Sequence, residues 1–414
     1  MPWLIVLFLS GCSRVDLVQP AEIEESAPSY GIEETAPLAE SAEASQAEGA
    51  TQQLSLEEVE AQLLPEFAES RAGTYAYDKL SEMEQQWYDD INRTLGNMLK
   101  KQELSEQGIK EGLSEKDIDR IFQCVLNDHP EYFYVEGYTY TCYTRLNKAV
   151  KIEFSGTYSM EPEEAARRRE EIREAVRKIL AGIPTTASDY EKIKYVYEYL
   201  VRSTEYNLEA PDNQNIYSVF VNCSSVCQGY AKATQYLLNE LGVHCTLVTG
   251  TVDTGEGHAW NLVYADGEYY YVDTTWGDAS YLIEEDIQQE GQYYPEINYD
   301  YLCITTEQLL RTHTLGSLVP MPLCEATEDN YYVREGVYFT EVDEEKLKAA
   351  FSPLADQSKT DVTIKCADIG IYEEMYRILV TDQKIFDYLA LEEGSIAYAQ
   401  NEKQLSMTFW LANG

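Results

Sequence analysis

Cys227 stands at a position where a cysteine can act as a nucleophile. Residues 230–241 place apolar side chains at helical spacing, and Gly242 follows as a helix terminator. Three polar residues before the cysteine are candidate N-caps: Asn222, Ser224 and Ser225. Cys227 therefore falls in or just before the first helical turn, where free N–H groups and a partial positive charge stabilise a thiolate. The alternative is a buried structural cysteine in a core helix.

A predicted β-hairpin would bring a histidine next to a carboxylate. Residues 258–264 and 268–274 are strand-like runs, and the dipeptide Asp266-Gly267 between them is a strong signal for a two-residue turn. With that turn and no bulge, His258 and Asp273 become diagonal neighbours on one face. Such neighbours lie about 7–8 Å apart at the backbone, within reach of a side-chain hydrogen bond. A slip of one residue would place the two side chains on opposite faces.

These three residues together supply the parts of an acyl-transfer site. A thiolate attacks the carbonyl carbon of an amide or ester. The histidine accepts the thiol proton and later donates it to the leaving amine. The aspartate fixes the tautomer of the histidine and supports the imidazolium. The backbone N–H of Cys227 is one candidate donor for an oxyanion hole.

The three residues lie in segments that resemble the transglutaminase-like superfamily of papain-like cysteine enzymes. The matching segments are VCQGYA around Cys227, GHAWN around His258 and YYVDTTW around Asp273, in that order. The resemblance implies Cys227 as nucleophile, His258 as base and Asp273 as orienting acid. It implies an α+β fold in which the helix bearing the cysteine packs on an antiparallel sheet, over about residues 185–325. It implies neither a cofactor nor a metal.

Four residues near these segments invite further predictions. Gly229 would allow another backbone or a substrate to approach closely, so it is a candidate pocket residue. Trp260 should share the face of His258, where it would either line the thiol pocket and exclude water or pack in the core. His313 and Cys324 match positions found after the core in similar proteins. We give both structural roles, because His313 is far from the triad in sequence and has no evident partner there.

The remaining cysteines do not form a recognisable framework. They are scattered along the chain without a Cys-x-x-Cys pair, which is typical of small buried hydrophobic residues. A zinc site is a further possibility, although the spacing is not that of a zinc finger. Its candidate ligands are Cys223, Cys227, His244, Cys245 and His258.

The first twelve residues, MPWLIVLFLSGC, resemble a bacterial lipoprotein signal that ends in a lipobox. The resemblance implies cleavage before Cys12 and a lipid on its sulfur, which would anchor the protein at the extracytoplasmic face of a bacterial membrane. The apolar run is too short to span a bilayer, which needs about 20 residues. No Lys or Arg precedes the run, so an unprocessed apolar N-terminus is the alternative.

The amino-acid composition predicts which partners the chain can bind and where its segments begin and end. Asp and Glu number 73 against 31 Lys and Arg, and a net charge of −42 repels phosphate, so we expect no nucleic-acid partner. The expected segments are a signal at 1–12, a disordered acidic tether at 13–55, a helix-rich α+β region at 56–184, the catalytic core at 185–325 and a small α+β region at 326–414.

The leading hypothesis is an exported, lipid-anchored cysteine enzyme that cleaves amide bonds of a peptide or protein through a thioacyl intermediate. Water as the acceptor would make it a protease or amidase, and a primary amine would make it a transglutaminase. Family analogy favours hydrolysis or cell-envelope processing. The alternative from another class is a catalytically silent surface protein that uses the same fold for binding or as a scaffold. A metal-dependent hydrolase is a third possibility, which chelation would test.

Overall fold

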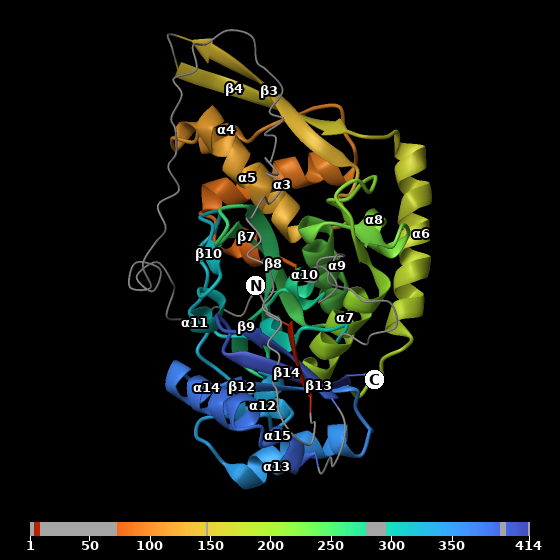
Figure 1. Ribbon diagram of the computed structural model, residues 1–414. Helices are drawn as coiled ribbons and strands as arrows, with labels where there is room; N and C mark the ends of the chain where they lie inside the picture. Colours follow the sequence, from red (N-terminus) through yellow and green to blue (C-terminus); the bar gives the residue numbers. More distant parts are fainter. Residues whose placement is uncertain (1–3, 9–72, 146–147, 279–294, 390–394, 413–414) are drawn as a thin grey trace. The chain divides into compact units, whose positions relative to one another are not determined.

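The computed structural model describes residues 4–8, 73–145, 148–278, 295–389 and 395–412 (Figure 1). The chain divides into two compact units. The site unit comprises Ser29–Thr275 and His313–Glu325, and the tail unit comprises Met1–Pro28, Trp276–Thr312 and Ala326–Gly414. These units differ from the expected segments, because the helix-rich residues before 185 group with the core and residues 276–312 group with the tail. The predicted tether and the lipidation residue Cys12 lie outside the described residues.

A four-stranded antiparallel sheet lies at the centre of the site unit. Its strands run in the order β10-β7-β8-β9. They are β7 (His244–Val252), β8 (Gly257–Ala265), β9 (Glu268–Val272) and β10 (His313–Leu315). The helix α9 (Cys227–Glu240) packs against β7 and β8, where buried Ala231, Leu247 and Ala259 meet and Cys227 packs beside them. This confirms the predicted α+β fold with a cysteine-bearing helix on an antiparallel sheet.

The β8–β9 hairpin has the register predicted from its turn. Asp266 and Gly267 both have positive φ, 51° and 94°, as a type I′ two-residue turn requires. Pairing then runs without interruption from Ala265↔Glu268 to Asn261↔Val272. Asp273 follows directly, so the diagonal relation with His258 is retained.

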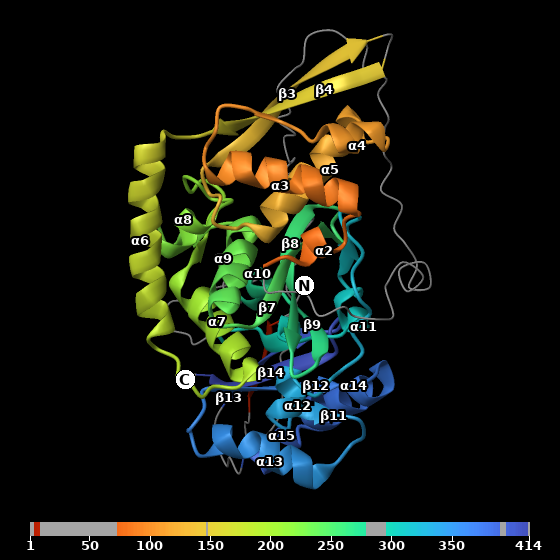
Figure 2. The ribbon, with the colours of Figure 1, turned by 180° about the vertical axis from the view of Figure 1, so that it is seen from behind.

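The remaining elements of the site unit are mostly helices (Figure 2). Three helices begin with a capping box, in which a serine side chain accepts from the N3 backbone and an acidic N3 side chain accepts in return. They are α3 (Glu82–Gly96), α5 (Glu115–Asp128) and α7 (Asp189–Ser203). The other helices are α2 (Tyr75–Asp78), α4 (Glu106–Lys110), α6 (Pro162–Leu180) and α8 (Ile216–Phe220). Two smaller sheets hold β2 (Gln102–Glu103), β4 (Lys148–Tyr158) and β3 (Val135–Arg145), and β5 (Glu205–Tyr206) with β6 (Ser224–Ser225).

Hydrogen bonds at the C-terminal end of α5 connect this helical region to the central sheet and α9. Asn127 Nδ2 donates to Thr246 Oγ1 on β7 at 2.9 Å, and Gln235 Nε2 on α9 donates to the carbonyl of Asn127 at 2.7 Å. The buried Asp128 carboxylate accepts from the backbone N–H groups of Ala76 and Tyr77. Buried hydrogen bonds are costly to break, so these contacts explain why the helical residues belong to the site unit.

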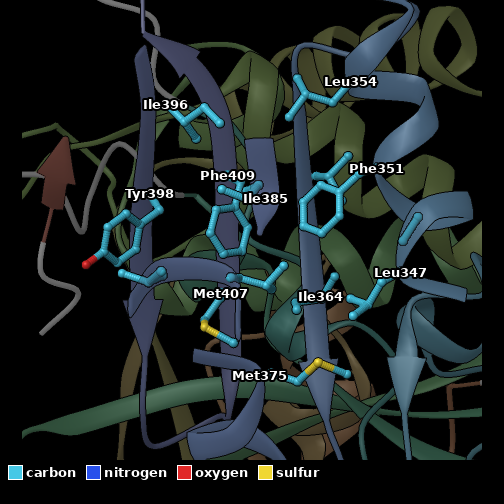
Figure 3. Packing of buried hydrophobic residues seen from close by; sticks show 14 of the residues in the cluster. Leu347, Phe351, Leu354, Ile364, Met375, Ile385, Ile396, Tyr398, Met407 and Phe409 are labelled. Carbon is cyan, nitrogen blue, oxygen red and sulfur yellow. The ribbon is translucent and has the colours of Figure 1, made fainter. Parts of the chain in front are cut away.

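The tail unit has its own sheet and hydrophobic core. The strand order is β1-β13-β14-β12-β11, and helices α13 (Glu344–Ala355) and α14 (Ile369–Tyr376) contact β12. The strands are β1 (Leu4–Phe8), β11 (Tyr338–Phe339), β12 (Asp361–Cys366), β13 (Ser395–Asn401) and β14 (Ser406–Ala412). In Figure 3, Phe351 and Phe409 lie among aliphatic side chains of the core, with ring centroids 5.4 Å apart and edge to face. The tail unit thus combines helices and strands, but it includes residues outside the expected region at 326–414.

The apolar run at the N-terminus bears on the export prediction. Residues Leu4–Phe8 form β1, which pairs antiparallel with β13. Within the part of the chain that the structure describes, no helix has both the length and the hydropathy to cross a membrane. The lipoprotein signal and its lipid anchor stay predictions.

Candidate active site

Cys227 is the first residue of α9, and its helix begins without a capping side chain. The N-cap is Val226, in an extended conformation, and no side chain caps the helix there. The expected N-caps are therefore wrong, because Ser224 and Ser225 form β6 and Ser225 Oγ donates to the carbonyl of Asn213 at 2.6 Å. A valine side chain cannot accept a hydrogen bond, so no capping side chain competes for the N–H groups at the end of the helix where the half-buried thiol lies.

Gly229 explains how the chain before the cysteine packs on this helix. A Cβ at this position would lie 1.9 Å from Ser225 Oγ and 3.0 Å from the carbonyl oxygen of Asn213. The buried glycine thus has the first of its two expected roles, close approach by another part of the chain. Its role in a substrate pocket stays a prediction.

His258 and Asp273 form the hydrogen bond that the hairpin register makes possible. His258 Nε2 lies 2.8 Å from Asp273 Oδ2, and the two side chains are 8% and 1% exposed. Cys227 is close enough to this histidine to be among the groups that raise its pKa. The aspartate thus fixes the orientation of the imidazole through Nε2.

The helix and the hairpin are held together by further hydrogen bonds. Asn261 Nδ2 on β8 donates to the carbonyl of Ala231 on α9 at 2.9 Å. Thr234 Oγ1 on α9 shares a 2.8 Å hydrogen bond with Thr274 Oγ1, in the residue directly after Asp273. All four of these residues are buried. The nucleophile and its partners are therefore carried by one rigidly connected pair of elements.

The electrostatics of the site favour a charged histidine. Burial alone would lower the pKa of His258, but the charge and hydrogen bond of Asp273 and the contact with Cys227 raise it to about 10. Burial alone would raise the pKa of Asp273, but His258 and His313 hold it well below its usual range. Asp273 is thus an ionised acceptor that stabilises the imidazolium of His258.

His313 joins the site from the far edge of the sheet. Its Nε2 lies 3.1 Å from Asp273 Oδ2, and its side chain is fully buried. The expectation that His313 lacks a partner is wrong. Sequence reasoning missed this contact because β10 follows β9 only after 40 residues, and three residues of β10 give no strand pattern of their own. Cys324, the other residue given a structural role, is buried with Sγ 3.8 Å from the carbonyl of Pro322.

Trp260 packs against both histidines. Its side chain is fully buried, with the ring 6.0 Å from His258 and 4.9 Å from His313 between centroids. Of the two roles expected for Trp260, the structure therefore shows packing. A tryptophan at this point fixes the positions of both imidazole rings.

Among the described residues, one group of side chains has the spacing to hold a metal. Its ligand atoms come from His258, Asp273 and His313 and lie within 4.8 Å of one another. The group shares only His258 with the five residues weighed as zinc ligands. Both Nε2 atoms lie at hydrogen-bond distance from one carboxylate oxygen, so hydrogen bonding already accounts for the arrangement.

Comparisons with known proteins agree with this geometry. Residues 174–274 match the family model described as the transglutaminase-like superfamily. The kyphoscoliosis peptidases of Mus musculus and Homo sapiens are 29% and 27% identical over 106 residues, which is 22% of this chain and 16% of each relative. The chain thus spans about a sixth of the length of these curated relatives.

Solved structures include similar chains. A crystal structure of a TGase matches at 16% identity with a TM-score of 0.26, covering 38% of this chain and 49% of that one. The periplasmic domain of TgpA from Pseudomonas aeruginosa matches at 16% identity with a TM-score of 0.22, covering 36% and 66%. By its family model, the domain at residues 174–274 is of the transglutaminase-like superfamily.

Proposed function

We propose that this protein is a cysteine enzyme that acts on amide bonds of a peptide or protein through a thioester on Cys227. One observation carries the proposal: a half-buried cysteine at an uncapped helix start interacts with a histidine that is held by a buried aspartate. A cysteine that served packing alone would need neither partner. The match of residues 174–274 to the transglutaminase-like family model supports the same chemistry.

The reaction follows from these positions. The thiolate of Cys227 attacks the amide carbonyl carbon, and the C–N bond breaks as His258 donates its proton to the leaving amine. Water or a second amine then attacks the thioester carbon, gives a proton to His258 and releases the sulfur as thiolate. Asp273 keeps the imidazole oriented in both steps and balances its charge. The backbone N–H of Cys227, at the start of α9, is the candidate donor for the oxyanion.

The location of the enzyme is part of the proposal. The run ending in Leu9-Ser10-Gly11-Cys12 supports export and a lipid anchor on Cys12, at the extracytoplasmic face of a bacterial membrane. Substrates would then be peptides or proteins of the cell envelope. The strongly acidic composition favours cationic peptides over nucleic acid as partners.

We expect hydrolysis to exceed amine transfer, and one assay compares the two. The whole chain is incubated with casein and biotin-pentylamine, and products are identified by mass spectrometry. Hydrolysis adds one water per cleaved bond, whereas transfer replaces ammonia with the labelled amine. EDTA should leave either product unchanged, because no step uses a metal.

The same assay has two outcomes that would overturn the proposal. Product formation that persists in Cys227→Ala would assign the chemistry to other groups. Activity lost on chelation and restored by zinc would favour a metal-dependent hydrolase on the group of His258, Asp273 and His313.

A further inference from the structure

We propose that His313 is a positioning residue of this site, which holds the Asp273 carboxylate ionised and aimed at His258. The inference rests on the proposed function, since it assigns His313 a role in the same reaction. It adds a fourth residue to the cysteine, histidine and aspartate. His313 does not contact the thiol in this role and acts only through Asp273.

The buried carboxylate is held by two imidazoles, one of them His313. Asp273 Oδ2 is approached by His258 Nε2 at 2.8 Å and by His313 Nε2 at 3.1 Å. The side chains of Asp273 and His313 are 1% and 0% exposed, so their contact is shielded from bulk water. An ionised carboxylate removed from water is stable only when donors satisfy its oxygens.

His313 can donate without adding a second positive charge. Burial lowers its pKa, and the nearby charge of His258 acts in the same direction, whereas Asp273 and Asp253 oppose them. A neutral imidazole with its proton on Nε2 satisfies the carboxylate and leaves His258 as the charged partner. The groups that face this arrangement are His258 on β8, Asp253 after β7, and Cys227 on α9, which contacts His258.

The pairing of β10 with β7 places His313 next to Asp273. β10 pairs with β7 in the register His313↔Val252, and Gly250 of β7 lies two residues further on the same face. A Cβ at Gly250 would lie 2.0 Å from the carbonyl oxygen of Thr314 and 2.7 Å from the Trp260 ring. The close approach of β10 therefore requires glycine there. Trp260 then packs against the face of the arrangement, edge to face with His313.

The expected consequence appears on the acid side of the pH profile. His313 is among the groups that lower the pKa of Asp273, so its removal makes that carboxylate easier to protonate. Once Asp273 is protonated, His258 loses the charge that keeps it an imidazolium. The reactive state of the thiol should therefore be lost at higher pH in a variant without the second donor.

The test measures the rate of iodoacetamide labelling of Cys227 against pH in the whole chain, by peptide mass spectrometry. His313→Leu should label about tenfold more slowly, as is common when a supporting hydrogen bond behind a functional histidine is removed. Its acid limb should move to higher pH. His313→Gln places an amide N–H near the position of Nε2 and should recover most of the rate and the acid limb. Thr314→Ala on the same strand is the matched control and should behave as the wild type.

His313→Asn covers the case in which the leucine variant does not fold. Asparagine is polar but too short to reach Asp273 Oδ2, so it should shift the acid limb as leucine does. Near-ultraviolet circular dichroism and Tm establish that each labelled variant is folded. Equal losses in folded Gln and Asn variants, with no shift of the acid limb, would mean that His313 serves packing alone and would overturn the inference.

The experiment separates this inference from the function on which it rests. A wild-type chain that labels rapidly beside folded leucine or asparagine variants with the same pH profile would overturn the role of His313 alone. A wild-type chain that labels slowly, without response to His258→Ala, would overturn the proposed function and the inference with it.

Discussion

Replacing Cys227 with alanine is expected to lower kcat about 10⁶-fold on any amide substrate that the wild-type chain turns over. No thioester can form without the sulfur, and the side chains that remain can only polarise the substrate or orient water. His258 and Asp273 would still form their hydrogen bond, so the fold should be retained. The comparison is made by steady-state kinetics, with unfolding midpoints measured in parallel.

Cys223 provides the matched control for this variant. It lies four residues before Cys227 and its side chain is exposed, so it would react readily with any added electrophile. Cys223→Ala should keep the wild-type kcat. If it instead abolished turnover while Cys227→Ala remained active, the nucleophile would have been assigned to the wrong cysteine.

The replacement Asp273→Asn is expected to lower kcat about 10⁴-fold, the size of loss seen when the orienting carboxylate of a serine triad becomes an amide. The amide cannot balance an imidazolium, and it can present an N–H where His258 needs an acceptor. Because burial by itself lowers the pKa of His258, that pKa should fall from its value of about 10. Kinetics and histidine NMR titration measure the two effects.

The free energy of unfolding should also depend on pH through His258. The pKa of His258 rises from 6.5 to about 10 on folding, so the protonated ring adds stability that is fully present below pH 6.5 and lost as pH rises through about 10. The free energy of unfolding of Asp273→Asn should vary less over that range than that of the wild type. Urea unfolding at several pH values gives both curves.

Asp266→Asn controls for the loss of a carboxylate on the same hairpin. Asp266 has φ 51° in the turn, a conformation that asparagine also adopts readily. This variant should keep wild-type kcat and stability. Equal activity of Asp273→Asn and Asp266→Asn would contradict the role given to Asp273.

The part of the site that sequence predicts well is the part set by local rules. A two-residue turn at Asp266-Gly267 allows few registers, so the relation of His258 to Asp273 follows from counting residues. Helical spacing after Cys227 likewise places the cysteine at a helix start. Each of these depends on neighbours within about 15 residues along the chain.

The contacts that sequence did not predict are those between distant segments. His313 meets Asp273 only because β10 adds to the opposite edge of the sheet from β9, and no spacing rule connects them. The N-cap was misplaced because Ser225 turns to the carbonyl of Asn213, a contact made by a loop that folds back. The grouping of residues 276–312 with the tail unit likewise depends on pairing across the chain, such as the buried ion pair of Asp300 and Lys365 at 3.1 Å.

The central claim is that Cys227 is a nucleophile made reactive by His258. The measurement that tests it most directly is the rate of iodoacetamide labelling at Cys227 against pH, with and without His258→Ala. We expect rapid labelling of the wild type well below pH 8 and much slower labelling of the variant. A rate that rises only near about pH 8.5, as for an ordinary thiol, and is the same in both proteins would contradict the account.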